Sequence, residues 1–203
     1  MRLPQHPCVF AVRLTSHSRR PGMLLPIGQM AASIALALLV GACETPPPGH
    51  PAPGTLLTHE QTNRMPLEKN ITAVGAFYDP YSPWIWNEDR SKMRGLIVNA
   101  LYLIGPDSMG VFGDGIIRPH IYVLEGAEGK ETPKLVKEWL LDPEQAMEWR
   151  ARKRTAMGWG YQLQLVWGDE LDFRGKRIRI TISFERTDGR VVHSAKKDFR
   201  VPA

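Results

Sequence analysis

RIRITISFERTDGR, residues 177–190, contains the clearest structural pattern in the chain. Three isoleucines and Phe184 occupy every second position, and charged or hydroxyl-bearing residues stand between them. Such alternation of an apolar and a polar face is typical of a β-strand that is half buried in a sheet. Asp188-Gly189 then predicts a tight turn, so VVHSAKKDFRV (191–201) is expected to return as the last strand.

Five further segments toward the N-terminus have strand character. They are ITAVGAFY (71–78), LIVNALYLI (96–104), IIRPHIYVL (116–124), LVKEWLL (135–141) and YQLQLVW (161–167). Gln162 and Gln164 fall on the face opposite to the apolar side chains of their strand. Pro119 lacks a backbone donor, so its presence predicts either an edge strand or a bulge.

About seven short strands separated by turn residues predict an all-β fold. The pattern resembles antiparallel β-sandwich modules of the immunoglobulin-like or C2-like kind, with the strand order left open. One short helix is expected after Asp142-Pro143-Glu144, because these residues suit a helix N-cap and first turn. Ala146, Met147 and Trp149 would then face the sheet.

The basic residues of the chain are distributed unevenly. Four of the 26 lysines and arginines precede Cys43, whereas all 21 acidic residues follow it. The remainder is therefore close to neutral, with 22 basic against 21 acidic residues. This balance excludes the strongly basic surface expected of a nucleic-acid-binding protein.

Residues 1–42 have the organisation of an export signal. Four arginines and no acid precede the run MAASIALALLV (30–40), whose 11 apolar or small residues are too few to cross a bilayer as a helix. A basic region followed by a short apolar run is typical of a secretory signal peptide.

The end of this leader, Val40-Gly41-Ala42-Cys43, resembles the lipobox of bacterial lipoproteins. The resemblance implies cleavage between Ala42 and Cys43, a diacylglyceryl thioether on Cys43 and a further acyl chain, such as palmitate, on the new N-terminus. Two or more acyl chains give lasting membrane attachment. Since Glu44 is not the aspartate associated with inner-membrane retention, the resemblance implies the outer membrane, facing the periplasm.

The segment 43–67 is expected to be a tether. Five of the residues between 46 and 53 are prolines, which favour the extended polyproline II conformation. Some twenty extended residues would hold a domain roughly 60 Å from the lipid at most. The predicted organisation is thus a signal peptide at 1–42, a lipidated tether at 43–67 and a β-sandwich at 68–203.

Motifs for catalysis and metal binding are not evident in the sequence. There is no Gly-x-Ser-x-Gly motif, and the four histidines that follow the leader lack zinc-ligand spacing: His50, His59, His120 and His193. Asp107 and Asp114 flank a glycine-rich loop, where they either hold Ca²⁺ or serve ordinary turn chemistry. The expectation is no catalytic residue, no metal and no cofactor.

Two segments are candidates for contacting a partner. FYDPYSPWIW (77–86) places Tyr81, Trp84 and Trp86 in a proline-broken stretch, where they either hold a ligand or close the open end of the sandwich. WRARKR (149–154) either meets an anionic partner such as lipid headgroups or forms a solvated helix end.

These observations predict a lipid-anchored cell-envelope protein with a non-enzymatic binding or scaffolding domain. One alternative is a carbohydrate- or peptidoglycan-binding module that uses the aromatic loop, and a second is an envelope hydrolase. The expected partners are the membrane, through the acyl chains, and an envelope protein or glycan; no nucleic acid is expected.

Overall fold

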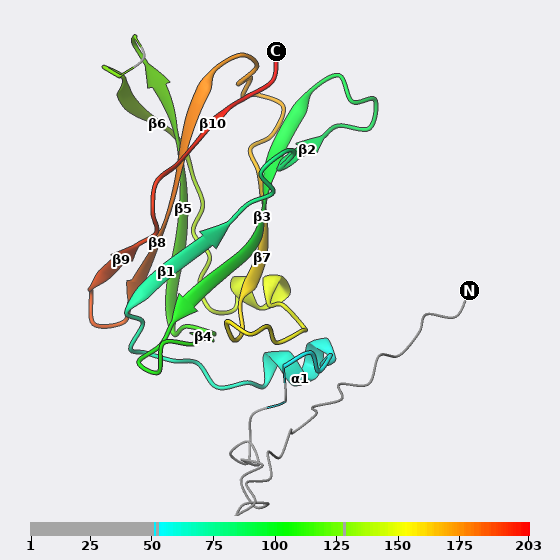
Figure 1. The fold of residues 1–203 in the computed structure, drawn as a ribbon, viewed down its shortest axis with the longest axis vertical. Helices are drawn as coiled ribbons and strands as arrows, with labels where there is room; N and C mark the ends of the chain where they lie inside the picture. The colour runs from blue at the N-terminus through cyan, green and yellow to red at the C-terminus, as the bar shows by residue number, and fades with distance from the viewer. Residues whose placement is uncertain (1–50, 52, 128) are drawn as a thin grey trace, which may run out of the picture. The chain divides into compact units, whose positions relative to one another are not determined.

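The computed structural model describes residues 51, 53–127 and 129–203, all within the compact unit Pro46–Ala203. The predicted signal peptide, the Ala42–Cys43 cleavage site and three of the five prolines at 46–53 lie outside these residues. Two antiparallel sheets of five strands each form the framework of the described chain. They pack as a sandwich (Figure 1), which confirms the predicted fold class. No helix in the described residues is long and apolar enough to span a bilayer.

The first sheet is organised around one long strand. Its members are β1 (Ala73–Phe77), β2 (Trp84–Trp86), β3 (Met93–Ile104), β4 (Gly110–Val111) and β7 (Tyr161–Val166). Leu101 on β3 pairs with Ala76 of β1 and with Tyr161 of β7, so these two strands lie on opposite edges of β3. One face of β3 and β7 packs against the core, and the other is open to solvent at Asn99, Gln162, Gln164 and Val166.

The second sheet contains the predicted hairpin. Its members are β5 (Gly115–Glu125), β6 (Thr132–Glu138), β8 (Arg177–Arg186), β9 (Val191–His193) and β10 (Lys197–Arg200). The returning strand is divided into β9 and β10, both paired with β8. At the break, the Ser194 hydroxyl accepts a hydrogen bond from the Ile182 amide at 3.0 Å, and the Ser194 amide donates to the Ile182 carbonyl.

The core lies between the two sheets and follows the alternation predicted for β8. Ile178, Ile180, Ile182 and Phe184 are all fully buried. They face the buried side chains of the first sheet: Leu96, Val98, Leu101, Leu103, Tyr161, Leu163 and Leu165. Burial of these apolar surfaces is the main favourable contribution to folding.

Pro119 lies in β5, an inner strand between β8 and β6, so the predicted edge position is wrong. A bulge with β6 does occur nearby, between Ile121 and Tyr122. The Pro119 carbonyl accepts a hydrogen bond from the Trp139 amide at 3.0 Å, just beyond the end of β6. Pairing resumes beyond Pro119, where Ile117 and Leu141 exchange two backbone hydrogen bonds, so the missing N–H interrupts the pairing at a single position next to the bulge.

The helix predicted after Asp142 is a single 3₁₀ turn, η1 (Gln145–Trp149). The Asp142 carboxylate accepts a hydrogen bond from the Gln145 amide at 2.8 Å, and the Gln145 side chain accepts one from the Asp142 amide at 3.2 Å. Ala146 is buried, while Met147 and Trp149 are half-buried. Asp142 therefore hydrogen-bonds the start of the turn as expected, but the N-cap position of η1 is Glu144, and the turn ends after five residues.

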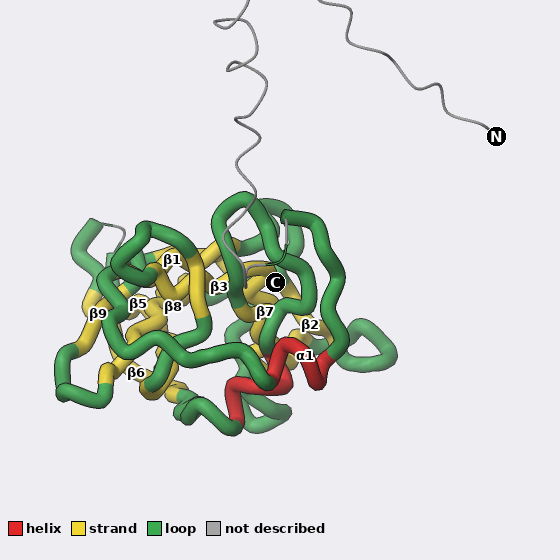
Figure 2. Tube along the Cα trace, turned by 90° about the horizontal axis from the view of Figure 1, so that it is seen from below, coloured by secondary structure: helices red, strands yellow, loops and turns green. Residues whose placement is uncertain are grey.

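A second helix, α1 (His59–Asn63), lies in the segment assigned to the tether. Figure 2 views the molecule from the end that carries it. Thr58 caps α1 and forms a capping box with Gln61, a Thr-x-x-Gln pattern that could have been recognised in the sequence. Thr62 is fully buried, and three apolar side chains of the segment pack against the core: Leu57, Met65 and Leu67. Packed structure thus begins well before the expected boundary at residue 68.

Replacement of Ile180 tests the face assignment of β8. Ile180→Ala is expected to lower the free energy of unfolding by roughly 2–5 kcal/mol, because it empties a fully buried site. Arg179→Ala is the matched control on the other face. Its guanidinium pairs with the Asp198 carboxylate at 2.7 and 2.8 Å in a partly exposed position, so its loss should cost about 1 kcal/mol or less. Urea denaturation of both variants measures the difference, and equal losses would contradict the assignment.

Candidate functional site

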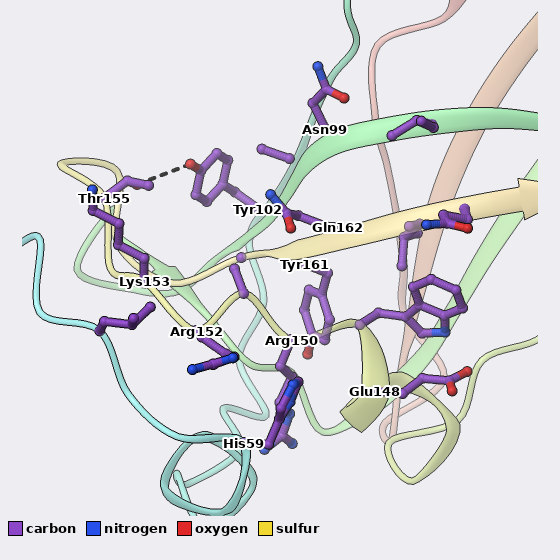
Figure 3. A pocket seen from close by; sticks show the side chains of 18 residues that line it. His59, Asn99, Tyr102, Glu148, Arg150, Arg152, Lys153, Thr155, Tyr161 and Gln162 are labelled. Atoms are coloured by element: carbon purple, nitrogen blue, oxygen red, sulfur yellow. Dashed lines mark hydrogen bonds between the residues drawn. The ribbon is translucent and has the colours of Figure 1, made fainter. Parts of the chain in front are cut away.

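A groove of about 700 Å³ lies on the exposed face of β3 and β7 (Figure 3). Outward-facing residues of β7 form the floor of the groove. Burial alternates along this strand, so Tyr161 and Leu163 are buried while Gln162 and Gln164 point outward. Asn99 on β3 is exposed on the same lining. Within the described part of the chain, the three side-chain amides make no hydrogen bonds to other residues, so their donors and acceptors are open to a ligand.

The rim of the groove is formed by the loop after η1 and by residues 56–59, which lead into α1. Arg152 and Lys153 come from the loop, and both are exposed. Leu56 and His59 come from the N-terminal side, where Leu56 forms an isolated β-bridge with Lys153. Glu148 is the one carboxylate among the lining residues of the groove. Charge on the rim is therefore predominantly positive.

Arg150, at the base of the same loop, is buried. Its guanidinium donates hydrogen bonds to the carbonyls of Thr62 at 3.0 Å and Asn63 at 3.2 Å, at the end of α1. The guanidinium carbon also lies 4.6 Å from the centre of the Phe112 ring. Burial lowers the pKa of Arg150, an effect opposed by the Tyr161 hydroxyl, and burial raises the pKa of Tyr161 to about 12.

Two more arginines of WRARKR bind the N-terminal segment in the same manner. Arg152 donates from Nε to the Leu57 carbonyl at 2.9 Å, and Arg154 donates from Nη1 to the Pro51 carbonyl at 3.1 Å. Backbone hydrogen bonds support this docking, from the Leu57 amide to the Arg152 carbonyl and from the Gly54 amide to the Arg154 carbonyl. The basic run therefore fastens the chain from Pro51 onward, a role that neither interpretation of the sequence included.

The three aromatic residues proposed for ligand contact do not lie together on the surface. Trp84 is only 9% exposed and packs edge-on against Phe199, with ring centres 5.7 Å apart. Tyr81 is 92% exposed and Trp86 is 39% exposed. None of the three lines the groove. Trp84 thus fills the core, and a ligand role for Tyr81 and Trp86 stays a prediction.

The candidate metal ligands have local structural roles. The Asp107 carboxylate accepts a hydrogen bond from the Met109 amide at 3.1 Å, within its own turn. The Asp114 amide donates to the Glu68 carbonyl, which joins this loop to the start of the domain. In the described ranges, no group of three histidine, cysteine or acidic side chains is placed to hold a metal ion.

A smaller hollow of about 410 Å³ lies over the second sheet. Its lining residues are Tyr122, Pro133, Arg179, Thr181, His193, Ser194 and Lys196. Arg179 is already paired with Asp198, so a main charged group of this hollow is neutralised within the protein. The larger groove is therefore the better candidate for binding a ligand.

No family model, curated protein or solved structure matches this chain. The fold by itself defines the class, an antiparallel β-sandwich domain with a groove on the exposed face of one sheet.

Arg150→Met tests how the groove rim is held. Methionine keeps much of the apolar stem but cannot donate to the two carbonyls at the end of α1, so the free energy of unfolding is expected to fall by roughly 2–3 kcal/mol. Trypsin should also cleave faster after Arg64, since α1 loses its attachment. Arg190→Met, at an exposed turn, is the control and should stay within about 0.5 kcal/mol. Equal stability of both variants, with unchanged cleavage, would contradict this role.

Proposed function

We propose that this chain is a lipid-anchored protein of the cell envelope whose β-sandwich binds a polar partner without catalysing a reaction. The anchor is Cys43, and the attachment is to the outer membrane on its periplasmic side. The groove on β3 and β7 is the binding site. The observation that carries this proposal is the set of three amides on its floor, Asn99, Gln162 and Gln164, which have no partner among the described residues.

The chemistry of the floor points to a ligand rich in hydroxyl and amide groups. Each side-chain amide offers two donors and an acceptor oxygen. The groove volume of about 700 Å³ falls in the usual range for small-ligand sites, roughly 300–1,000 Å³. Glycan strands of peptidoglycan present both hydroxyl and acetamido groups, and they are within the compartment that the proposed anchor faces.

Binding is favoured over hydrolysis by the state of the acid–base groups. Glu148 and His59 are the carboxylate and the imidazole among the lining residues. In the described part of the chain neither makes a hydrogen bond that would orient it, whereas a general acid or base needs to be positioned against the reacting atom. This supports a non-enzymatic role.

Sedimentation with purified peptidoglycan sacculi tests the groove. The double variant Gln162→Ala/Gln164→Ala should bind about tenfold more weakly than the wild type, because several ligand hydrogen bonds of about 0.5–1.5 kcal/mol each are lost. Val166→Ala is the matched control, since Val166 is exposed on the same strand and does not line the groove. Absence of wild-type binding would contradict a glycan ligand.

The aromatic loop supplies the second candidate site, because Tyr81 and Trp86 are exposed. In the same sedimentation experiment, Tyr81→Ala/Trp86→Ala should leave binding unchanged if the groove is the site. Loss of binding in this variant alone would place the binding site at the aromatic loop. It would support the alternative function, a carbohydrate- or peptidoglycan-binding module that uses this loop.

Cys43→Ala tests the anchor. The variant is expected to accumulate as an uncleaved, unacylated precursor, whereas the wild type should partition into detergent. Mass spectrometry of the N-terminal peptide measures both the cleavage site and the added mass. An unmodified mature N-terminus, or cleavage at another position, would contradict lipidation at Cys43.

A further inference from the structure

The point at which the chain leaves the sandwich limits its distance from the proposed anchor. Arg154 and Arg152 bind the carbonyls of Pro51 and Leu57, so the chain is fastened from residue 51. Eight residue steps separate Cys43 from Pro51. At no more than about 3.6 Å per residue, they reach about 29 Å in any conformation. That is about half of the 60 Å expected for a tether running to residue 67.

The surface next to this exit point combines an apolar side chain with cations. Leu56 is 66% exposed and pairs with Lys153 in a β-bridge. Lys153 has no ion-pair partner among the described residues, and Arg152 and His59 complete the group on the same rim. We name these four residues, Leu56, His59, Arg152 and Lys153, the exit-side patch.

Acidic groups near the exit-side patch do not cancel its charge. Glu60 follows His59, but its carboxylate is paired with Arg64 at 2.5 Å. Glu148 lines the groove and is the one carboxylate facing the same space. An exposed leucine flanked by basic side chains matches an anionic lipid surface, where the cations meet phosphates and the apolar group enters the headgroup layer.

We propose that the exit-side patch docks on the anionic phospholipid headgroups of the membrane that carries the anchor. This inference rests on the proposed lipid anchor, which brings the patch within reach of that surface. Two features support it: the eight residue steps between the proposed anchor at Cys43 and Pro51, and the charge and exposure of the four residues. Docking would set the orientation of the sandwich and place the rim of the groove at the membrane.

Amine labelling of Lys153 tests the docking. The full acylated chain is reconstituted into vesicles of phosphatidylcholine alone or mixed with phosphatidylglycerol, and the labelling rate of each lysine is measured by mass spectrometry. The rate at Lys153 should fall several-fold in the anionic vesicles and recover in high salt, because exposed charge interactions are screened. Lys176, an exposed residue directly before β8 that does not line the groove, is the internal reference and should be unaffected.

Substitutions distinguish docking through the exit-side patch from general adhesion of the protein to the vesicles. Arg152→Gln/Leu56→Ser should abolish the protection of Lys153, whereas Lys176→Gln should retain it. An anchored chain with equal Lys153 labelling in both vesicles overturns the docking but not the proposed function. Equal protection of Lys153 and Lys176 also overturns it, since adhesion would then not involve the patch.

Flotation distinguishes failure of the anchor from failure of the patch. If the chain floats only with anionic vesicles, and the Lys153→Gln variant no longer floats with them, the proposed anchor is overturned and docking through the patch is supported. A chain that floats with neither vesicle overturns both.

Discussion

A buried guanidinium holds together the parts of this molecule that form its groove. Arg150 is surrounded by the Phe112 ring, the Tyr161 hydroxyl and the carbonyls that end α1. Burying a charge is costly unless it is hydrogen-bonded, so the guanidinium stabilises the conformation in which these carbonyls lie against it. With Arg150 in place, Arg152 and Arg154 follow at two-residue intervals along the same segment and bind carbonyls earlier in the chain.

The sandwich could be predicted from the sequence because its signals are local. Alternation in β7 and β8 and the Asp188-Gly189 turn depend on neighbouring residues alone, and the structure bears them out. The role of WRARKR depends on contacts with residues about 90 to 100 positions away. Helix α1 has only five residues, too few to show a helical period, so the segment resembled an unstructured tether.

Only part of the candidate site could be predicted from the sequence, because the rest also depends on contacts between distant residues. The outward direction of Gln162 and Gln164 follows from strand period, but their neighbours depend on which strand pairs with β7 and in which register. Ile97 of β3 pairs with Gln164, which brings Asn99 to the same groove. Likewise, Trp84 and Trp86 share a face in an unbroken strand, whereas a register shift between Ile85 and Trp86 leaves one ring buried and the other partly exposed.

Attachment of the chain from Pro51 onward also affects the effective concentration and the orientation at which the proposed binding would occur. A partner held near a membrane meets a membrane-anchored domain at an effective concentration set by the length and stiffness of the link. A link of at most about 29 Å confines the groove more closely than one of roughly 60 Å. Docking through the exit-side patch would confine its orientation as well, which reduces the freedom lost when a ligand binds. Under this proposal, the arginines that attach the segment position the rim of the groove, and the three amides on the paired strands supply the hydrogen bonds to the ligand.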